Sequence, residues 1–266
     1  MRHRLPFLDQ PPRVAVLRLE GVIASNGTRG ALSHAAIAPL IERAFRKAKP
    51  TAVALSINSP GGSPAQSSLI GGQIRRLADE LDIPVHAFVE DVAASGGYWL
   101  AAAADDIHVD ASSITGSIGV ISAGFGFHDL IERYGIERRV HTAGEDKSIL
   151  DPFRPERDRD IERLKALQTR IHDSFIAFVQ VRRGDRLDTS RDLFTGEIFV
   201  GAEAVDAGLV DGIGHLVPVM KARYGDKTTF RALTMRRPLL QRLIPSVALD
   251  LMASIEQRAA WSRYGL

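Results

Sequence analysis

The feature that most constrains the fold of this sequence is a strand-like segment followed by a helix-like segment, a unit that occurs three times in the first 110 residues. The strand-like segments are rich in Val, Ile, Leu and Ala and occupy residues 13–24, 51–58 and 83–90. The helix-like segments occupy residues 34–48, the residues from Ala65 onward, and residues 95–104. Strands and helices alternating at this spacing are typical of an α/β fold with parallel strand pairing. We expect any chemistry at the turns that follow the strands.

The second half of the chain has a different pattern. Residues 145–184 are highly charged, and their second part has apolar residues at helical spacing, which predicts a long amphipathic helix. These apolar residues are Ile161, Leu164, Leu167, Ile171, Phe175 and Phe178. Beyond residue 226 basic residues alternate with a Leu-rich helical pattern that Pro245 interrupts. The sequence therefore predicts an N-terminal arm over 1–12, a main domain over 13–226 and a helical tail over 227–266.

Composition indicates a globular protein without a nucleic-acid-binding surface. Of the 266 residues 45% are hydrophobic, which is enough for a buried core. The net charge is only +2, so no basic polymer-binding surface is indicated. The sequence has no cysteine, which excludes disulfides and a thiol nucleophile. Neither the N-terminus nor the longest uncharged run, residues 111–127, resembles a signal peptide or a membrane span, so we expect a cytoplasmic protein.

Two turns carry residues that suit acyl-transfer chemistry. Gly61 and Gly62 follow the second strand, and because glycine lacks Cβ their N–H groups can approach a ligand closely. They form either an oxyanion hole or merely a tight turn. Ser95 has the same position one strand later, among small neighbours, and is either an exposed nucleophile or a helix N-cap. The residues alone leave both alternatives open.

The histidines and acidic residues do not suggest another kind of site. His108 and His128 flank a segment without histidine, and each is more typical of a strand or loop residue than of a catalytic base. No H-E-x-x-H motif or other metal-spaced cluster occurs, and the G-F-G at 124–126 lacks the third glycine of a dinucleotide-binding motif. We therefore expect no metal and no cofactor.

Five short segments between residues 13 and 216 point to one family when they are taken in order. They are INSPGG at 57–62, AASGGYW at 93–99, TGSIGV at 115–120, GEDKSILDPFRPE at 144–156 and FTGEIFVGAEAVDAGLVDGIG at 194–214. Together they resemble the S49 family of serine peptidases, of the signal peptide peptidase A type. The resemblance implies a ClpP/crotonase-like superhelix of repeated β-β-α units, which here precedes an amphipathic helical C-terminal tail.

The resemblance also implies a role for each matching residue. Ser95 would be the nucleophile, Lys147 the general base, and Ser117 the residue that orients the lysine amine. The oxyanion donors would be the backbone N–H of Gly61 or Gly62 together with that of Gly96. Desolvation can lower the pKa of a lysine amine by several units from about 10.4, so we expect Lys147 to be shielded from water. Asp146 stands where the family often has an aromatic residue. This difference affects the expected shape of the substrate pocket more than the expected chemistry.

The family's substrates and assembly provide further expectations. The resemblance implies an endopeptidase that cleaves apolar peptides such as remnants of signal peptides, and a homo-oligomeric ring. The tail over 227–266 either lies on an anionic membrane surface or packs on the body or on a neighbouring subunit. Two other functions stay open, a crotonase-type acyl-CoA enzyme and a non-catalytic peptide-binding scaffold.

Overall fold

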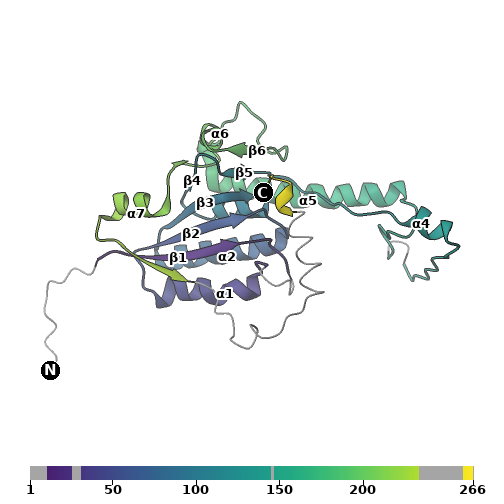
Figure 1. Cartoon of the computed structure of the whole chain (residues 1–266), viewed down its shortest axis with the longest axis horizontal. Coiled ribbons are helices and arrows are strands. Elements are labelled where there is room, and N and C mark those ends of the chain that lie inside the picture. The colour runs from purple at the N-terminus through teal and green to yellow at the C-terminus, as the bar shows by residue number, and fades with distance from the viewer. Residues whose placement is uncertain (1–10, 26–30, 145–146, 234–259, 266) are drawn as a thin grey trace, which may run out of the picture.

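A computed structural model describes residues 11–25, 31–144, 147–233 and 260–265 of the chain (Figure 1). Its centre is a mixed α/β fold with an eight-stranded sheet. The strands are β1 (Arg13–Glu20), β2 (Ala52–Ser59), β3 (Val85–Ala94), β4 (Asp106–Val109), β5 (Ile114–Gly116), β6 (Ile198–Val200), β7 (Gly212–Ile213) and β8 (Thr229–Leu233). The α-helices are α1 (His34–Glu42), α2 (Pro64–Leu81), α3 (Gly96–Ala102), α4 (His128–Arg133), α5 (Asp158–Arg183), α6 (Ala202–Asp206) and α7 (Leu216–Tyr224). A π-helical turn, η1 (Arg43–Lys47), extends α1, and a 3₁₀ turn, η2 (Gly184–Arg186), follows α5.

The sheet is parallel except at one edge, as the alternation of strands and helices predicts. The strand order is β6-β5-β3-β2-β1-β8, and among the described strands only the β5–β6 pairing is antiparallel. β3 pairs along its first half with β4 and along its last three residues with β5. The carboxyl ends of β2, β3 and β5 therefore lie next to one another, which places the turns after these strands at a single edge.

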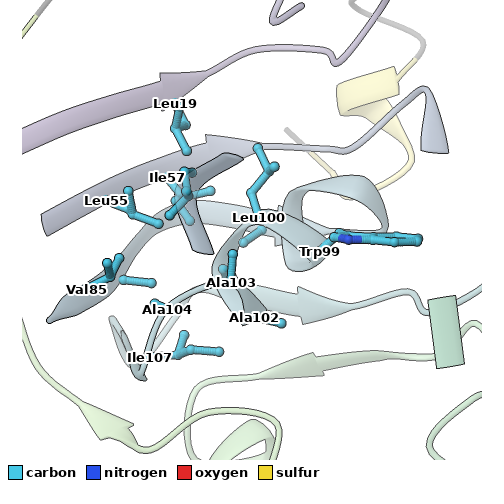
Figure 2. Close-up of a cluster of buried hydrophobic side chains, with 14 of the residues drawn as sticks. Leu19, Leu55, Ile57, Val85, Trp99, Leu100, Ala102, Ala103, Ala104 and Ile107 are labelled. Atoms are coloured by element: carbon cyan, nitrogen blue, oxygen red, sulfur yellow. The ribbon is translucent and has the colours of Figure 1, made fainter. Parts of the chain in front are cut away.

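The two faces of the sheet carry different amounts of apolar packing. Helices α1, α2, α3 and α5 cover one face and form the main core, part of which is shown in Figure 2. A smaller apolar cluster, centred on Phe88 and Met220, lies between α7 and the other face. β2 is buried along its whole length because consecutive side chains alternate between these two clusters.

The C-terminal region differs from the predicted helical tail. Residues Thr229–Leu233 form strand β8, which pairs in parallel with the free edge of β1. The predicted tail therefore begins too early, because these five residues satisfy the unpaired backbone groups of an edge strand instead of continuing a helix. Residues 234–259, which hold most of the predicted tail, lie outside the described residues, and residues 260–265 lie beside the body of the protein (Figure 1). No helix among the described residues is long and apolar enough to cross a membrane.

Candidate active site

Ser95 stands at the turn between β3 and α3 in a conformation that non-glycine residues rarely adopt. Its φ is 51° and its ψ is −120°. A left-handed backbone at a residue with a side chain costs about 1–3 kcal/mol and is concentrated at functional sites. The backbone N–H of Ser95 donates to the carbonyl of Gly116 at 2.9 Å, so this turn is fixed to the end of β5.

The side chain of Ser95 does not cap the helix that it precedes. Ser33 and Ser63 occupy the equivalent positions before α1 and α2, and each hydroxyl accepts a backbone N–H of its helix. Ser95 makes no such side-chain hydrogen bond with α3. Ser95 therefore occupies the N-cap position, as one alternative from the sequence has it, but without side-chain capping, and its hydroxyl is available for another role.

Three glycines near Ser95 differ in whether their backbone N–H groups are hydrogen-bonded. The N–H of Gly61 donates to Ser59 Oγ at 3.2 Å, within the turn itself. The N–H groups of Gly62 and Gly96 make no hydrogen bond within the described part of the chain, and Gly96 is the first residue of α3, where helical N–H groups lack intrahelical acceptors. A Cβ built on Gly96 would lie 3.3 Å from the N of Gly62, so the two groups are close together.

Close packing explains why glycine occupies these positions. Gly62 has a φ of 141°, and a Cβ there would lie 2.1 Å from the carbonyl oxygen of Ile23. A Cβ on Gly61 would lie 2.9 Å from Ser95 Cβ, and one on Gly96 would lie 2.4 Å from Ser67 Oγ. The turns after β2 and β3 can approach each other only because these residues lack side chains.

Ser117 follows β5 and has a second strained backbone. Its φ is 51°, its N–H donates to the carbonyl of Glu197 at 2.7 Å, and its carbonyl accepts the N–H of Gly119 at 2.9 Å. Since Ser95 N is bonded to Gly116, the residue before Ser117, the structure brings the Ser95 and Ser117 segments together.

Tyr264, in the C-terminal segment, reaches this edge of the sheet. Its hydroxyl lies 3.5 Å from Ser117 Oγ and 3.4 Å from the carbonyl oxygen of Pro60. Sequence reasoning missed Tyr264, because no motif surrounds it and it is separated from Ser117 by 147 positions.

Lys147 lies elsewhere in the protomer. It is exposed, and it belongs to the segment between β5 and α5, which with α4 forms an arm that extends away from the sheet (Figure 1). Among the described residues no hydrogen bond joins Lys147 to Ser95 or Ser117. The shielded amine expected from the sequence is thus not present within a single protomer. Asp146 lies outside the described residues.

The histidines flanking the Ser117 segment have other surroundings. The ring of His108 stacks on Phe88 at 5.5 Å, on the face of the sheet that α7 covers. His128 begins α4 on the arm, where it lies with Asp129 and Glu132 so that their potential ligand atoms are within 4.8 Å of one another. Sequence reasoning did not single out this group, in which His128 and Glu132 lie on one side of the helix because they are four residues apart. All three residues are at least partly exposed.

Comparison with known proteins supports one family. A family model described as Peptidase family S49 matches residues 78–225, more than half of the chain. The Na(+)/H(+) antiporter NhaA of Brucella melitensis is 47% identical over 271 residues, which cover 95% of this chain and 37% of that protein. Protease 4 of Haemophilus influenzae is 31% identical, over 79% of this chain and 34% of that protein. The chain thus spans about a third of the length of these two curated relatives.

Solved structures with the same fold are known. The membrane-bound stomatin-specific protease 1510-N, as a serine-to-alanine mutant, superposes with a TM-score of 0.51 at 15% identity, over 85% of this chain and 99% of that chain. A lysine-to-alanine mutant of that protease, in complex with a substrate peptide, superposes with a TM-score of 0.51 at 14% identity, over 92% of this chain and 98% of that chain. At this identity the similarity shows a shared fold.

Proposed function

Because the chain belongs to peptidase family S49, we propose that it is a serine endopeptidase whose nucleophile is Ser95. The observation that carries the proposal is the hydroxyl of Ser95, which does not cap α3 and has no hydrogen bond to a described residue, on a strained turn beside the available N–H groups of Gly62 and Gly96. A nucleophile needs an exposed oxygen, and a tetrahedral intermediate needs N–H donors next to it. We assign the oxyanion hole to Gly62 and Gly96 rather than Gly61, since the N–H of Gly61 is already bonded to Ser59.

The proposed reaction passes through an acyl-enzyme. Ser95 Oγ attacks the peptide carbonyl carbon while its proton moves to the neutral amine of Lys147. The carbonyl oxygen becomes an oxyanion that accepts the two N–H groups, each of which contributes about 3–4 kcal/mol in comparable enzymes. The C–N bond then breaks, the lysine ammonium protonates the leaving amine, and an ester remains on Ser95. Water, deprotonated by the same amine, hydrolyses the ester and restores Ser95.

The position of Lys147 makes a second copy of the chain part of this proposal. Lys147 is exposed, and its segment forms part of an arm that extends from the body. We propose that the subunits form a homo-oligomeric ring in which Lys147 of the partner subunit enters the site of Ser95. Contact with the neighbour would also remove water from the amine, which favours its neutral form.

Apolar peptides, such as remnants of signal peptides, are the proposed substrates. Residues 117–127 follow the strained Ser117 without forming a helix or strand. Two of their large side chains are mostly exposed, Ile121 at 69% and Phe125 at 81%. An extended segment of this kind offers apolar contacts to a peptide lying next to Ser95. We further propose that the sheet and its helices form the ClpP/crotonase-like superhelix of β-β-α units.

The names of the relatives favour a peptidase over the other candidates. Protease 4 and the stomatin-specific protease are named for proteolysis. The antiporter name belongs to a whole protein of which this chain matches 37%, and the S49 region lies within the part that is shared. We therefore propose peptidase activity, and not ion transport, for this chain.

A fluorophosphonate probe and a fluorogenic apolar peptide test the proposal together. We expect the probe to label wild-type protein at Ser95 and the peptide to be hydrolysed, with both signals absent in Ser95→Ala. Peptide binding without labelling or turnover would support the scaffold alternative. Hydrolysis of an acyl-CoA that persists in Ser95→Ala would support a crotonase-type enzyme. Either result would overturn the proposed function.

A further inference from the structure

One face of α5 contacts the segments of both Ser95 and Ser117. Trp99, on the helix that starts after Ser95, stacks on Phe175 at 4.7 Å and on Phe178 at 5.1 Å between ring centroids. His172 lies one turn before Phe175, and its Nε2 is 2.9 Å from the carbonyl oxygen of Ile118. Residues three or four apart lie on the same side of a helix, so α5 fixes the two segments relative to each other.

The contact made by His172 has a defined direction. A carbonyl oxygen can only accept, so Nε2 must carry the proton and donate. The same nitrogen then cannot take a proton from another group while this bond is present. Ile118 is fully buried, and its carbonyl has its hydrogen bond from the side chain of an adjacent helix. Loss of the donor would leave a polar group without a partner inside the protein.

Ser117 is fixed on both sides by these bonds. Its own N–H is held by the carbonyl of Glu197, and the carbonyl of the next residue is held by His172. Its backbone is in the left-handed region at a φ of 51°, which a residue with a side chain keeps only when its surroundings enforce it. The peptide between Ile118 and Gly119 accepts the bond from His172 through its carbonyl and donates its N–H to the carbonyl of Ser117, so a change in its orientation would also move the Ser117 hydroxyl.

We propose that His172 is a positioning residue that holds Ser117 in the orientation needed to receive the lysine amine. The inference rests on the proposed function, in which Ser117 orients that amine. His172 acts through the Ile118 carbonyl and does not touch the substrate. Because α5 also follows the arm that carries Lys147, His172 connects the base of that arm to the catalytic edge.

Substitution of His172 and of Ser117, alone and together, tests the inference. His172→Phe keeps a ring of similar shape but removes the donor, whereas His172→Gln places an amide N–H near the position of Nε2. We expect His172→Phe to lower kcat about tenfold with KM nearly unchanged, and His172→Gln to recover most of that loss. Thr169→Ala, one turn before His172 on α5, should behave as wild type, because Thr169 is exposed and its hydroxyl bonds to the carbonyl of Lys165 within the helix.

A double-mutant cycle separates positioning from a purely structural role. If His172 acts through Ser117, His172→Phe should have little further effect on kcat in a Ser117→Ala background. Additive losses, or a fall in Tm that Gln does not recover, would overturn the inference. If His172→Phe does not fold, His172→Asn, whose amide is too short to reach the carbonyl, replaces it in the cycle. Absence of Ser95-dependent hydrolysis in the wild type would instead refute the proposed function.

Discussion

In the described part of the chain three serines directly precede α-helices, and their hydroxyls are used in two different ways. Ser33 and Ser63 bond to the first turns of their helices, and Ser95 does not. The difference arises from the backbone, because Ser33 is extended at a φ of −126° and Ser95 is left-handed at 51°. A serine at a helix start can therefore be assigned to capping or to catalysis only when its dihedral angles are known.

Replacement of these serines by alanine should separate the two roles. Ser95→Ala should reduce peptide hydrolysis by at least about three orders of magnitude, with little change in Tm, because it removes the nucleophile and no capping bond. Ser33→Ala should lower the free energy of unfolding by about 1 kcal/mol and leave kcat near wild type. Steady-state kinetics and urea unfolding of both variants provide the comparison. Equal losses of activity would contradict the assignment.

Substitution by alanine should lower the free energy of unfolding at one glycine and raise it at another. Gly62→Ala places a methyl group against the carbonyl of Ile23 at a φ of 141°, so we expect a loss of at least about 2 kcal/mol in unfolding free energy and a severe loss of activity. A Cβ on Gly72, within α2, would meet no heavy atom within 4 Å, so Gly72→Ala should gain up to about 1 kcal/mol. Denaturant titrations of the pair test this, and a neutral Gly62→Ala would disprove the packing argument.

At the scale of elements, an ion pair between a buried arginine and a partly exposed aspartate joins the end of α5 to the turn before β7. Arg183 is buried and donates through Nη1 to Asp211 at 2.7 Å, and the side chain of Asp211 also accepts the N–H of Ile107 at 2.7 Å. Arg186 adds a second cation at 3.1 Å from Asp211. This network holds the carboxyl-terminal end of α5 against β4, which keeps the helix in place for its contacts with Trp99 and Ile118.

Removal of the carboxylate that pairs with the buried Arg183 should lower stability strongly. Asp211→Asn leaves the Arg183 charge buried without its anion, so we expect the free energy of unfolding to fall by about 3–5 kcal/mol. The exposed pair of Glu137 with Arg139 is the matched control, and Glu137→Gln should change stability by less than about 1 kcal/mol. Urea unfolding at pH 7 measures both. A similar small effect for the two variants would show that the Arg183 pair is effectively solvated.

At the scale of the whole molecule, two carboxylates should make stability depend on pH. Burial raises the pKa of Asp211, but hydrogen bonds and charge from Arg183 outweigh it, so the pKa lies below its ordinary value of 3.8. Burial also raises the pKa of Asp106, and hydrogen bonds from His108, His86 and Arg223 outweigh it, so this pKa is lowered as well. A carboxyl that is more acidic in the folded state stabilises that state above its unfolded pKa, and this contribution is lost as pH falls.

We therefore expect the free energy of unfolding to decrease below about pH 4, where these carboxylates begin to be protonated in the unfolded chain. Urea titrations at pH 7 and at pH 3.5 measure the decrease. Asp211→Asn should show a smaller decrease than wild type, since it removes one of the carboxyl groups whose pKa is lowered in the folded state. Identical pH dependence in the two proteins would exclude Asp211 as a source.

Subunit mixing tests whether the catalytic pair forms between copies of the chain. Ser95→Ala and Lys147→Ala should each be inactive. If Lys147 of the partner subunit completes each site, rings mixed in equal amounts should regain about a quarter of wild-type activity, because one site in four would receive an intact serine and an intact lysine. If the pair forms within one protomer, mixing should recover nothing. Native mass spectrometry of the mixture confirms that the subunits have exchanged.

Much of this protein could be predicted from its sequence. The periodicity of residues 13–104 predicted the order of strands and helices, because β-rich apolar runs and amphipathic helical faces are local patterns. The long helix over the second part of 145–184 was predicted from its apolar spacing and is found as α5. The resemblance to the S49 family is confirmed. It could be recognised from the sequence because each of its motifs is a short continuous segment of the chain.

Other properties depended on contacts between residues far apart in the sequence. Strand β8 exists because the edge of β1, more than 200 residues earlier, offers it a partner. The free hydroxyl of Ser95, the engaged N–H of Gly61 and the bond from His172 to Ile118 are likewise set by neighbours from other elements. The exposure of Lys147 is set by the path of the arm, which no local pattern encodes. The sequence by itself determined the elements and the kind of chemistry, because both depend on local residue types. Only the tertiary structure decided which hydroxyl and N–H groups are available to react. Whether such a group is already hydrogen-bonded depends on which residues from other elements lie next to it.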